Sequence, residues 1–119
     1  MRLWIDDVWP APDGYIWCKD IETAIYEITR REKELDFLYR DYVLSRLDIE
    51  RLKRFEEVYV ITEISCDNDL GENEAEGYKL LNWLELTKRN YPIRIHSANP
   101  VARERMRAII KRNNWKEVF

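Results

Sequence analysis

Short apolar runs alternate with longer amphipathic stretches along this chain, and the alternation predicts strands joined by helices. The runs that fit strands cover residues 2–5, 15–18, 58–66 and 93–95, and residues 115–119 form either a short last strand or a packed tail. Apolar, aromatic and β-branched side chains in such runs are typical of buried strands. Strands that alternate with helices pair in parallel through right-handed crossovers. We therefore predict a three-layer α/β fold with a mostly parallel sheet of four or five strands.

Helical periodicity fills the spaces between these strands. Asp20 can cap a first helix, because apolar residues recur after it at helical spacing. The region 30–57 is highly charged but keeps an apolar residue every three to five positions, and Asp48 can begin a separate helix within it. We expect a charged helical insert built as a helical pair with a solvated face, and a partner-docking arm is the alternative. Further helices are expected to start near Asn73 and after Asn99.

Composition and charge narrow the class of protein. A chain of 119 residues with 45% hydrophobic and 36% charged residues fits one folded domain over residues 1–119. A net charge of −3 disfavours a groove for long nucleic acids but is compatible with a small phosphorylated ligand. No apolar run approaches the roughly 18 residues of a membrane span, and no signal peptide opens the chain, so a cytoplasmic location is expected. Cys18 and Cys66 have no metal or disulfide spacing, and Cys66, inside the expected third strand, is expected to be a buried apolar residue.

Three of the expected strands run directly into polar side chains. The first ends at Asp6 and Asp7, the third leads to Asp67 and Asp69, and the fourth ends at His96, the sole histidine. In a parallel sheet, ligands bind beyond the carboxyl ends of the strands, so these residues are expected to meet on one rim. Carboxylate oxygens of this kind suit Mg²⁺, and a histidine suits acid–base catalysis near neutral pH.

The segment after the fourth strand has the features of an anion site. Ser97, Asn99 and the backbone N–H groups after Pro100 lie where a helix begins, and a helix N-terminus favours phosphate. Arg103 falls in the first turn of that helix, where it either reaches a phosphate oxygen or remains a solvated surface residue. Gly77, on the buried stripe of an earlier helix, indicates close approach to the sheet or to a ligand.

Aromatic residues flank the acidic loop that follows the first strand. Trp9, Tyr15 and Trp17 either stack on a base or join the core, and in so small a domain the core is the commoner use. Ser65 precedes the acidic turn at Asp67, but no histidine next to it in the sequence would activate it. A nucleophilic serine is therefore not expected.

Five short motifs follow one another in order along the chain. They read Leu3-Trp4-Ile5-Asp6-Asp7-Val8-Trp9-Pro10, Pro12-Asp13-Gly14-Tyr15, Asp67-Asn68-Asp69-Leu70-Gly71, Gly77-Tyr78 and His96-Ser97-Ala98-Asn99-Pro100. In this order they resemble the pattern of the cyclic-phosphate processing receiver domain family, which is related to response-regulator receiver domains. The resemblance leaves out only the charged region 30–57. It implies a receiver-like (flavodoxin-like) fold and a phosphoesterase that acts on small cyclic phosphates derived from nucleotides or RNA processing.

Two features depart from the related patterns. Asn68 stands where the family usually has histidine, so it is expected to contact the ligand without carrying a proton. Unlike ordinary response-regulator receivers, the chain has no long helix between its first two expected strands and no Thr-Lys-Pro signature near its end. A mechanism that needs two histidines is therefore not expected to operate unchanged.

The residues and the resemblance together predict the members of a site. Catalytic candidates are His96, Asp67 and Asp69; ligand-binding candidates are Asn68, Ser97, Asn99, Arg103 and Gly77; candidates for a divalent metal, Mg²⁺ by preference, are Asp6, Asp7 and Asp67. Three alternatives to an enzyme stay open. The first alternative is a non-catalytic module that binds a phosphorylated small ligand. The second is a signalling domain that uses Asp67 as phosphoacceptor, and the third is an interaction protein that works through its charged insert.

Overall fold

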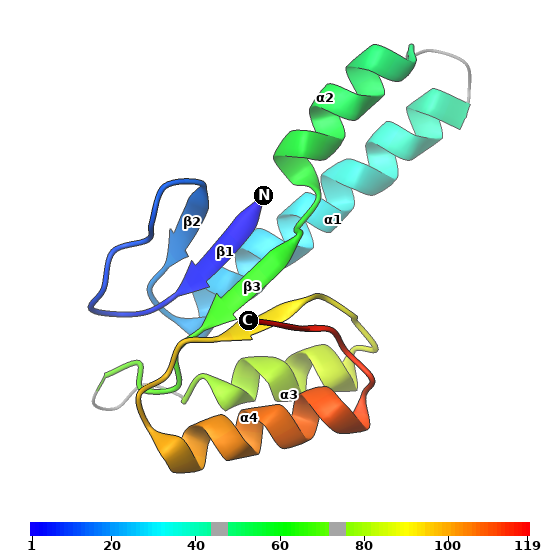
Figure 1. The fold of residues 1–119 in the computed structure, drawn as a ribbon. Helices are drawn as coiled ribbons and strands as arrows, with labels where there is room; N and C mark the ends of the chain where they lie inside the picture. The colour runs from blue at the N-terminus through cyan, green and yellow to red at the C-terminus, as the bar shows by residue number, and fades with distance from the viewer. Residues whose placement is uncertain (44–47, 72–75) are drawn as a thin grey trace.

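The computed structural model describes residues 1–43, 48–71 and 76–119. Its elements, in chain order, are β1 (Arg2–Ile5), β2 (Tyr15–Cys18), α1 (Ile21–Val43), α2 (Ile49–Tyr59), β3 (Glu63–Cys66), α3 (Tyr78–Leu86), β4 (Ile93–Ile95), α4 (Pro100–Arg112) and β5 (Glu117–Val118) (Figure 1). The strands form one sheet in the order β2-β1-β3-β4-β5, and every neighbouring pair is parallel. The predicted flavodoxin-like α/β class is therefore confirmed, and the end of the chain contributes the short strand β5.

Strand alternation assigns the two faces of the sheet different tasks. Leu3, Ile5, Ile64, Cys66 and Ile93 are all fully buried, and the parallel registers place them on one common face. They join a single core cluster with apolar residues of the helices: Ala24 and Ile28 of α1, Leu80, Leu81 and Leu84 of α3, and Met106, Ile109 and Ile110 of α4. One continuous core therefore lies between this face of the sheet and the helices.

The opposite face of the sheet carries polar and aromatic side chains that contact one another. Tyr15 donates a hydrogen bond from its hydroxyl group to Glu63, and Arg94 donates to the same carboxylate at 3.0 Å. The Arg2 guanidinium lies 4.3 Å from the centre of the Tyr15 ring, and the Trp4 ring meets the Tyr15 ring edge to face. Figure 1 shows α1 passing behind the sheet, and none of the described helices lies in front of β2, β1 and β3.

The connectivity explains why the helices share one face. The crossovers from β2 to β3, β3 to β4 and β4 to β5 all advance in one direction across the sheet, and right-handed crossovers of one direction lie on one side. Only the step from β1 to β2 runs the other way, and its connection, residues 6–14, contains Pro10 and Pro12 and no helix. The layer count therefore differs from the expected three, because no described helix covers the second face.

The third strand is shorter than its sequence predicts. We expected it to span residues 58–66, but α2 continues through Tyr59 and β3 begins only at Glu63. The Val58 carbonyl accepts a hydrogen bond from the Arg31 guanidinium, and the Val60 N–H closes the helix on the Glu56 carbonyl at 2.9 Å. Tertiary contacts of α2 with α1 thus override the strand preference of the β-branched residues in this segment.

The charged region forms a helical pair that extends beyond the sheet (Figure 1). Asp48 caps α2 by accepting a hydrogen bond from the Arg51 N–H at 2.8 Å, as the sequence predicts. Asp20 caps the preceding helix in the same way, through the Thr23 N–H at 2.7 Å. That helix, α1, runs without interruption through Arg30, so the expected start of the insert falls inside one helix. The expected helix start near Asn73 lies outside the described residues.

No described helix is apolar enough over a sufficient length to cross a bilayer, although α1 itself has 23 residues.

Gly77 marks a close approach of the start of α3 to the end of β3. A Cβ atom at this position would lie 1.9 Å from the Asp67 carbonyl oxygen and 3.0 Å from the Asn68 Cα atom. The Gly77 N–H also donates a hydrogen bond of 2.7 Å to the Asn68 carbonyl. The expected close approach to the sheet is therefore real, and it fixes the backbone at the carboxyl end of β3.

We expect Gly77→Ala to lower the free energy of unfolding by at least about 2 kcal/mol, because backbone atoms of Asp67 and Asn68 occupy the space that the methyl group needs. Urea unfolding followed by circular dichroism measures the change. Lys79→Ala, on the exposed side of α3, is the control and should stay within about 0.5 kcal/mol of the wild type. A Gly77→Ala protein as stable as the wild type would contradict the packing described.

Candidate functional site

Backbone hydrogen bonds of the sheet continue one residue beyond the ends of the strands. The N–H groups of Asp6, Asp67 and His96 donate to the carbonyls of Cys18, Ile5 and Cys66, respectively, at 3.1, 2.9 and 3.1 Å. Because the strands are parallel, these bonds set the three residues side by side at the carboxyl edge of the sheet. The expected meeting of the first, third and fourth strand ends is confirmed for these three residues.

Three carboxylates from two of these strand ends form an acidic cluster. One oxygen each of Asp6, Asp7 and Asp67 lies within 4.8 Å of the others. Burial and the nearby charge of Asp6 raise the pKa of the Asp67 carboxyl group, with hydrogen bonds from the following backbone and the His96 ring acting against them. No lysine or arginine of the described ranges forms an ion pair with these three carboxylates. Such a set of hard oxygen donors fits a divalent cation such as Mg²⁺.

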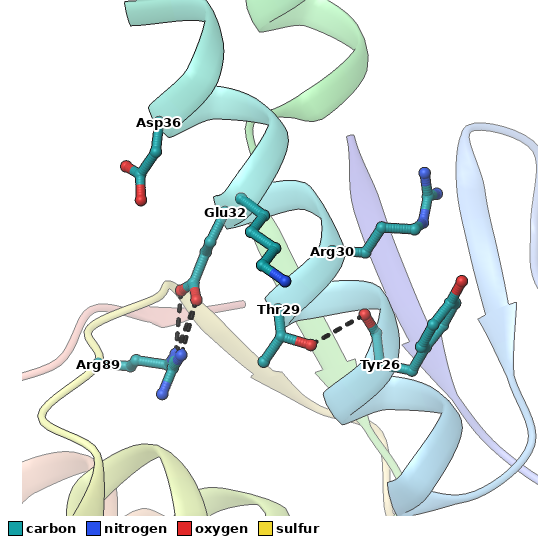
Figure 2. A pocket seen from close by; sticks show the side chains of 7 residues that line it. Tyr26, Thr29, Arg30, Glu32, Asp36 and Arg89 are labelled. Carbon is teal, nitrogen blue, oxygen red and sulfur yellow. Dashed lines mark hydrogen bonds and ion pairs between the residues drawn. The ribbon is translucent and has the colours of Figure 1, made fainter. Parts of the chain in front are cut away.

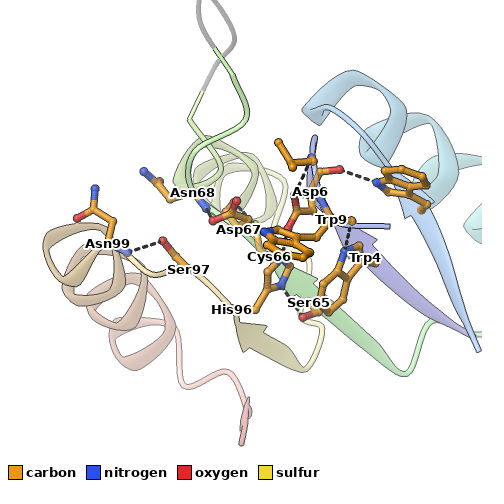
Figure 3. A network of polar contacts seen from close by, with 12 residues as sticks. Trp4, Asp6, Trp9, Ser65, Cys66, Asp67, Asn68, His96, Ser97 and Asn99 are labelled. Carbon is orange, nitrogen blue, oxygen red and sulfur yellow. Dashed lines mark hydrogen bonds and ion pairs between the residues drawn. The ribbon is translucent and has the colours of Figure 1, made fainter. Parts of the chain in front are cut away.

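Asp6 is buried and held at both of its carboxylate oxygens (Figure 3). Its Oδ1 atom accepts the N–H groups of Val8 at 2.9 Å and Trp9 at 3.0 Å, which fixes the turn after β1. Its Oδ2 atom lies 3.1 Å from His96 Nε2. Asp6 therefore closes the turn after β1 and is at the same time a member of the acidic cluster.

The His96 ring is engaged on both nitrogens and on one face. Nδ1 lies 2.8 Å from Ser65 Oγ, Nε2 lies 3.1 Å from Asp6 Oδ2, and the Trp4 ring stacks on the imidazole with centroids 3.9 Å apart. Burial lowers the pKa of His96 and so favours the neutral ring. The charge and hydrogen bond of Asp6 act in the opposite direction but are the smaller effect. An ionised Asp6 only accepts hydrogen bonds, so the neutral ring must carry its proton on Nε2 and accept from Ser65 at Nδ1.

Ser65 and Trp4 are members of the site that sequence reasoning did not identify. Ser65 is fully buried, so its hydroxyl group supports the His96 ring and offers no accessible nucleophile. Both residues lie on the uncovered face of the sheet, where the register pairs Trp4 with Ser65. The alternation of β1 and β3 contains this signal, but it becomes readable only when the parallel register is known.

The turn after Asp67 serves the start of α3. Asn68 is 2% exposed, its Oδ1 atom accepts the Tyr78 N–H at 3.3 Å, and its amide group donates to Glu76 at 3.2 Å. Asp69 is exposed and contacts the Asn68 amide group at 3.5 Å, apart from the acidic cluster. The structure therefore does not bring Asn68 or Asp69 to the rim. Gly77 was expected to approach either a ligand or the sheet, and the backbone of Asp67 and Asn68 fills the space beside it.

The expected anion site at the start of α4 is already capped. Asn99 Oδ1 accepts the N–H groups of Val101 at 3.0 Å and Ala102 at 3.2 Å, and buried Ser97 accepts the Asn99 N–H at 3.2 Å. The N–H groups that were expected to be free for phosphate are therefore used by the cap. Arg103, in the same turn, is exposed.

A surface hollow of about 460 Å³ lies away from this site, between α1 and the segment before β4 (Figure 2). Arg89 and Glu32 meet across it in a two-pronged ion pair with hydrogen bonds of 2.8–3.0 Å. The segment before β4 belongs to the amino edge of the parallel sheet, whereas ligands of such sheets bind at the carboxyl edge. The candidate site is therefore the carboxyl edge, where the acidic cluster and His96 lie.

A family model described as Cyclic-phosphate processing Receiver domain matches residues 1–112. No curated protein and no solved structure matches the chain.

The hydrogen bonds of His96 predict its tautomer. We expect the neutral Nε2–H form at pH 7.5 and a titration midpoint below the ordinary pKa of 6.5, because burial favours the uncharged ring. A pH series of ¹⁵N–¹H correlation spectra measures both, and the assignment is direct because the chain has one histidine. The spectra are recorded with a chelator so that no added ion perturbs Asp6. An Nδ1–H tautomer or a midpoint above 6.5 would contradict this arrangement.

Proposed function

The chain belongs to the cyclic-phosphate processing receiver domain family, and on that premise we propose that it opens a small cyclic phosphodiester with the help of a divalent metal ion. One observation carries the proposal: the carboxylates of Asp6, Asp7 and Asp67 converge within 4.8 Å, and within the described ranges no lysine or arginine pairs with them. Three neighbouring carboxylates with no lysine or arginine partner repel one another, and groupings of this kind are typical of functional sites.

The donor set supports Mg²⁺ as the ion. Each of Asp6, Asp7 and Asp67 offers one carboxylate oxygen, and Mg²⁺ prefers such oxygens together with retained waters and substrate phosphate. A bound Mg²⁺ would polarise a phosphoryl oxygen and lower the pKa of a coordinated water. The backbone N–H groups of Val8 and Trp9 hold Asp6 Oδ1 and the His96 ring holds Oδ2, so the Asp6 carboxylate has a fixed orientation within the cluster.

The reaction proposed is the addition of water to the phosphorus atom. One P–O bond of the ring breaks, the departing oxygen takes up a proton from solvent water, and a phosphomonoester results. Asp67 is suited to take the proton of the attacking water, because burial raises its pKa and a more basic carboxylate is a better acceptor. Arg103, exposed in the first turn of α4, is a candidate cation for the phosphate.

His96 contributes to this scheme by orienting Asp6. The Nε2–H group holds Asp6 Oδ2, Ser65 holds Nδ1, and Trp4 holds the ring plane. A neutral imidazole in this state has no free lone pair for a substrate proton. Histidines that fix a carboxylate in this way act through the position of that carboxylate.

A second candidate function is binding of a cyclic phosphate without turnover. The specific observation in its favour is that both His96 nitrogens are engaged, while Asn68, where the family usually has histidine, is buried. No imidazole of this chain is therefore free to carry a proton at the rim. Such a module would recognise the ligand through the same acidic cluster and its metal ion.

The test is incubation with nucleoside 2′,3′-cyclic phosphates, with Mg²⁺ and with a chelator, followed by ³¹P NMR. We expect a phosphomonoester signal with Mg²⁺ and a loss of about 10²- to 10⁴-fold in Asp67→Asn. Asp13→Asn, an exposed carboxylate of the same loop as Asp6 and Asp7, is the matched control and should retain the wild-type rate. Shifted ligand signals without product would instead favour the binding module, and labelling of Asp67 by acetyl phosphate would favour the phosphoacceptor.

Two substitutions of His96 separate an orienting role from proton transfer. His96→Ala removes the donor to Asp6 and should lower the rate about 10- to 100-fold. His96→Gln keeps an N–H group near the position of Nε2, so it should recover much of that loss if orientation is the role. Equal losses in both variants, with folding verified by circular dichroism, would show that the imidazole itself transfers the proton.

A further inference from the structure

Trp9 is an exposed tryptophan on a fixed backbone next to the acidic cluster. Its side chain belongs to a residue that is 69% exposed, while its N–H group donates to Asp6 Oδ1 at 3.0 Å. Its carbonyl oxygen accepts the indole N–H of Trp4 at 2.9 Å. The point from which the ring extends is therefore held on both sides, and one of its anchors is a carboxylate of the site.

The two neighbouring tryptophans have a different task. Trp4 uses its ring to stack on His96 and its indole N–H to hold the Trp9 carbonyl. Trp17 donates its indole N–H to the Asp6 carbonyl at 2.6 Å, and Lys19 lies over its ring. Both are thus engaged in the scaffold, whereas the Trp9 indole makes no hydrogen bond to the described part of the chain. Figure 3 shows Trp9 on the same side of the sheet edge as Asp6 and Asp67.

We propose that Trp9 is the stacking platform for the base of a nucleoside cyclic phosphate, an inference that rests on the proposed function and narrows its substrate class. In a nucleotide, a ribose separates the base from the phosphate. With the phosphate at the carboxylates, the base would lie one ribose away, and Trp9 is an exposed aromatic residue whose backbone contacts Asp6. Base stacking on an exposed indole tolerates any base, because each base has an aromatic face.

Location distinguishes Trp9 from the other exposed aromatic residues. Phe37 is also 69% exposed, but it lies on α1, in the helical pair that extends away from the sheet. Single exposed apolar residues are common on protein surfaces and need no ligand. What sets Trp9 apart is its hydrogen bond to a carboxylate of the site. Phe37 is therefore a matched control for the removal of an exposed aromatic ring.

The test compares adenosine 2′,3′-cyclic phosphate with ribose 2,3-cyclic phosphate, which has the same reacting group but no base. In the wild type, kcat/KM should favour the adenosine compound. Trp9→Ala should reduce this preference about 10- to 100-fold, chiefly through KM, and Trp9→Phe should restore most of it. Phe37→Ala should leave both substrates unaffected. A Trp9→Ala protein that keeps the preference would overturn the inference while leaving the proposed function intact.

If the wild type opens neither compound, the proposed reaction fails, and binding decides the inference separately. The probes are then adenosine 3′-monophosphate and ribose 3-phosphate, each with Mg²⁺. The readout is the indole N–H signal of Trp9, assigned by its absence in Trp9→Phe. A shift with the nucleotide alone supports stacking. No shift, or equal shifts with both probes, would overturn it.

Discussion

The parallel hydrogen bonding at the carboxyl edge of the sheet is the constraint on which the site depends. Asp6, Asp67 and His96 come from three separate strand ends, and each donates its N–H to the neighbouring strand one step beyond the regular ladder. Their side chains meet because these backbone hydrogen bonds fix the three residues side by side at the edge of the sheet. The repulsion between carboxylates is tolerated because the pairing of β1 with β3 over buried residues such as Leu3 and Ile64 is set by the core. The burial of apolar residues in the core thus offsets the repulsion between the assembled carboxylates.

A parallel sheet with helices on one face only is unusual, because such sheets are generally covered on both faces. Here polar and aromatic side chains take over part of that covering. Tyr15 and Arg94 both bond to Glu63, and Trp4 stacks on His96. The described part of the chain has no buried side-chain nitrogen or oxygen without a hydrogen-bond partner, so this face avoids the usual cost of buried polar groups. The site is the carboxyl end of the same network, since Ser65 and Trp4 support His96.

Local signals in the sequence predicted most elements of the fold. Capping residues such as Asp48 marked helix starts, and acidic or imidazole groups after short apolar runs marked the site. The sequence does not show which of several possible groups a side chain or carbonyl contacts in the folded chain. The Asn68 side chain can contact a ligand or cap α3, and only the position of Tyr78 N–H decides between them. Likewise the segment from Val58 favours a strand until Arg31 bonds its carbonyl and extends α2. The number of helical layers depended on the direction of each crossover, which residue patterns do not encode.

Cys66 is fully buried in the packed junction between the end of β3 and the start of α3. Its thiol group points to the carbonyls of Asp67 and Gly77, and burial raises its pKa far above that of a free cysteine. An alkylating reagent can therefore reach it only when the junction between β3 and α3 separates. The rate at which Cys66 is alkylated would therefore report local opening of this junction, a few bonds from the carboxylates, through a cysteine that the chain already contains.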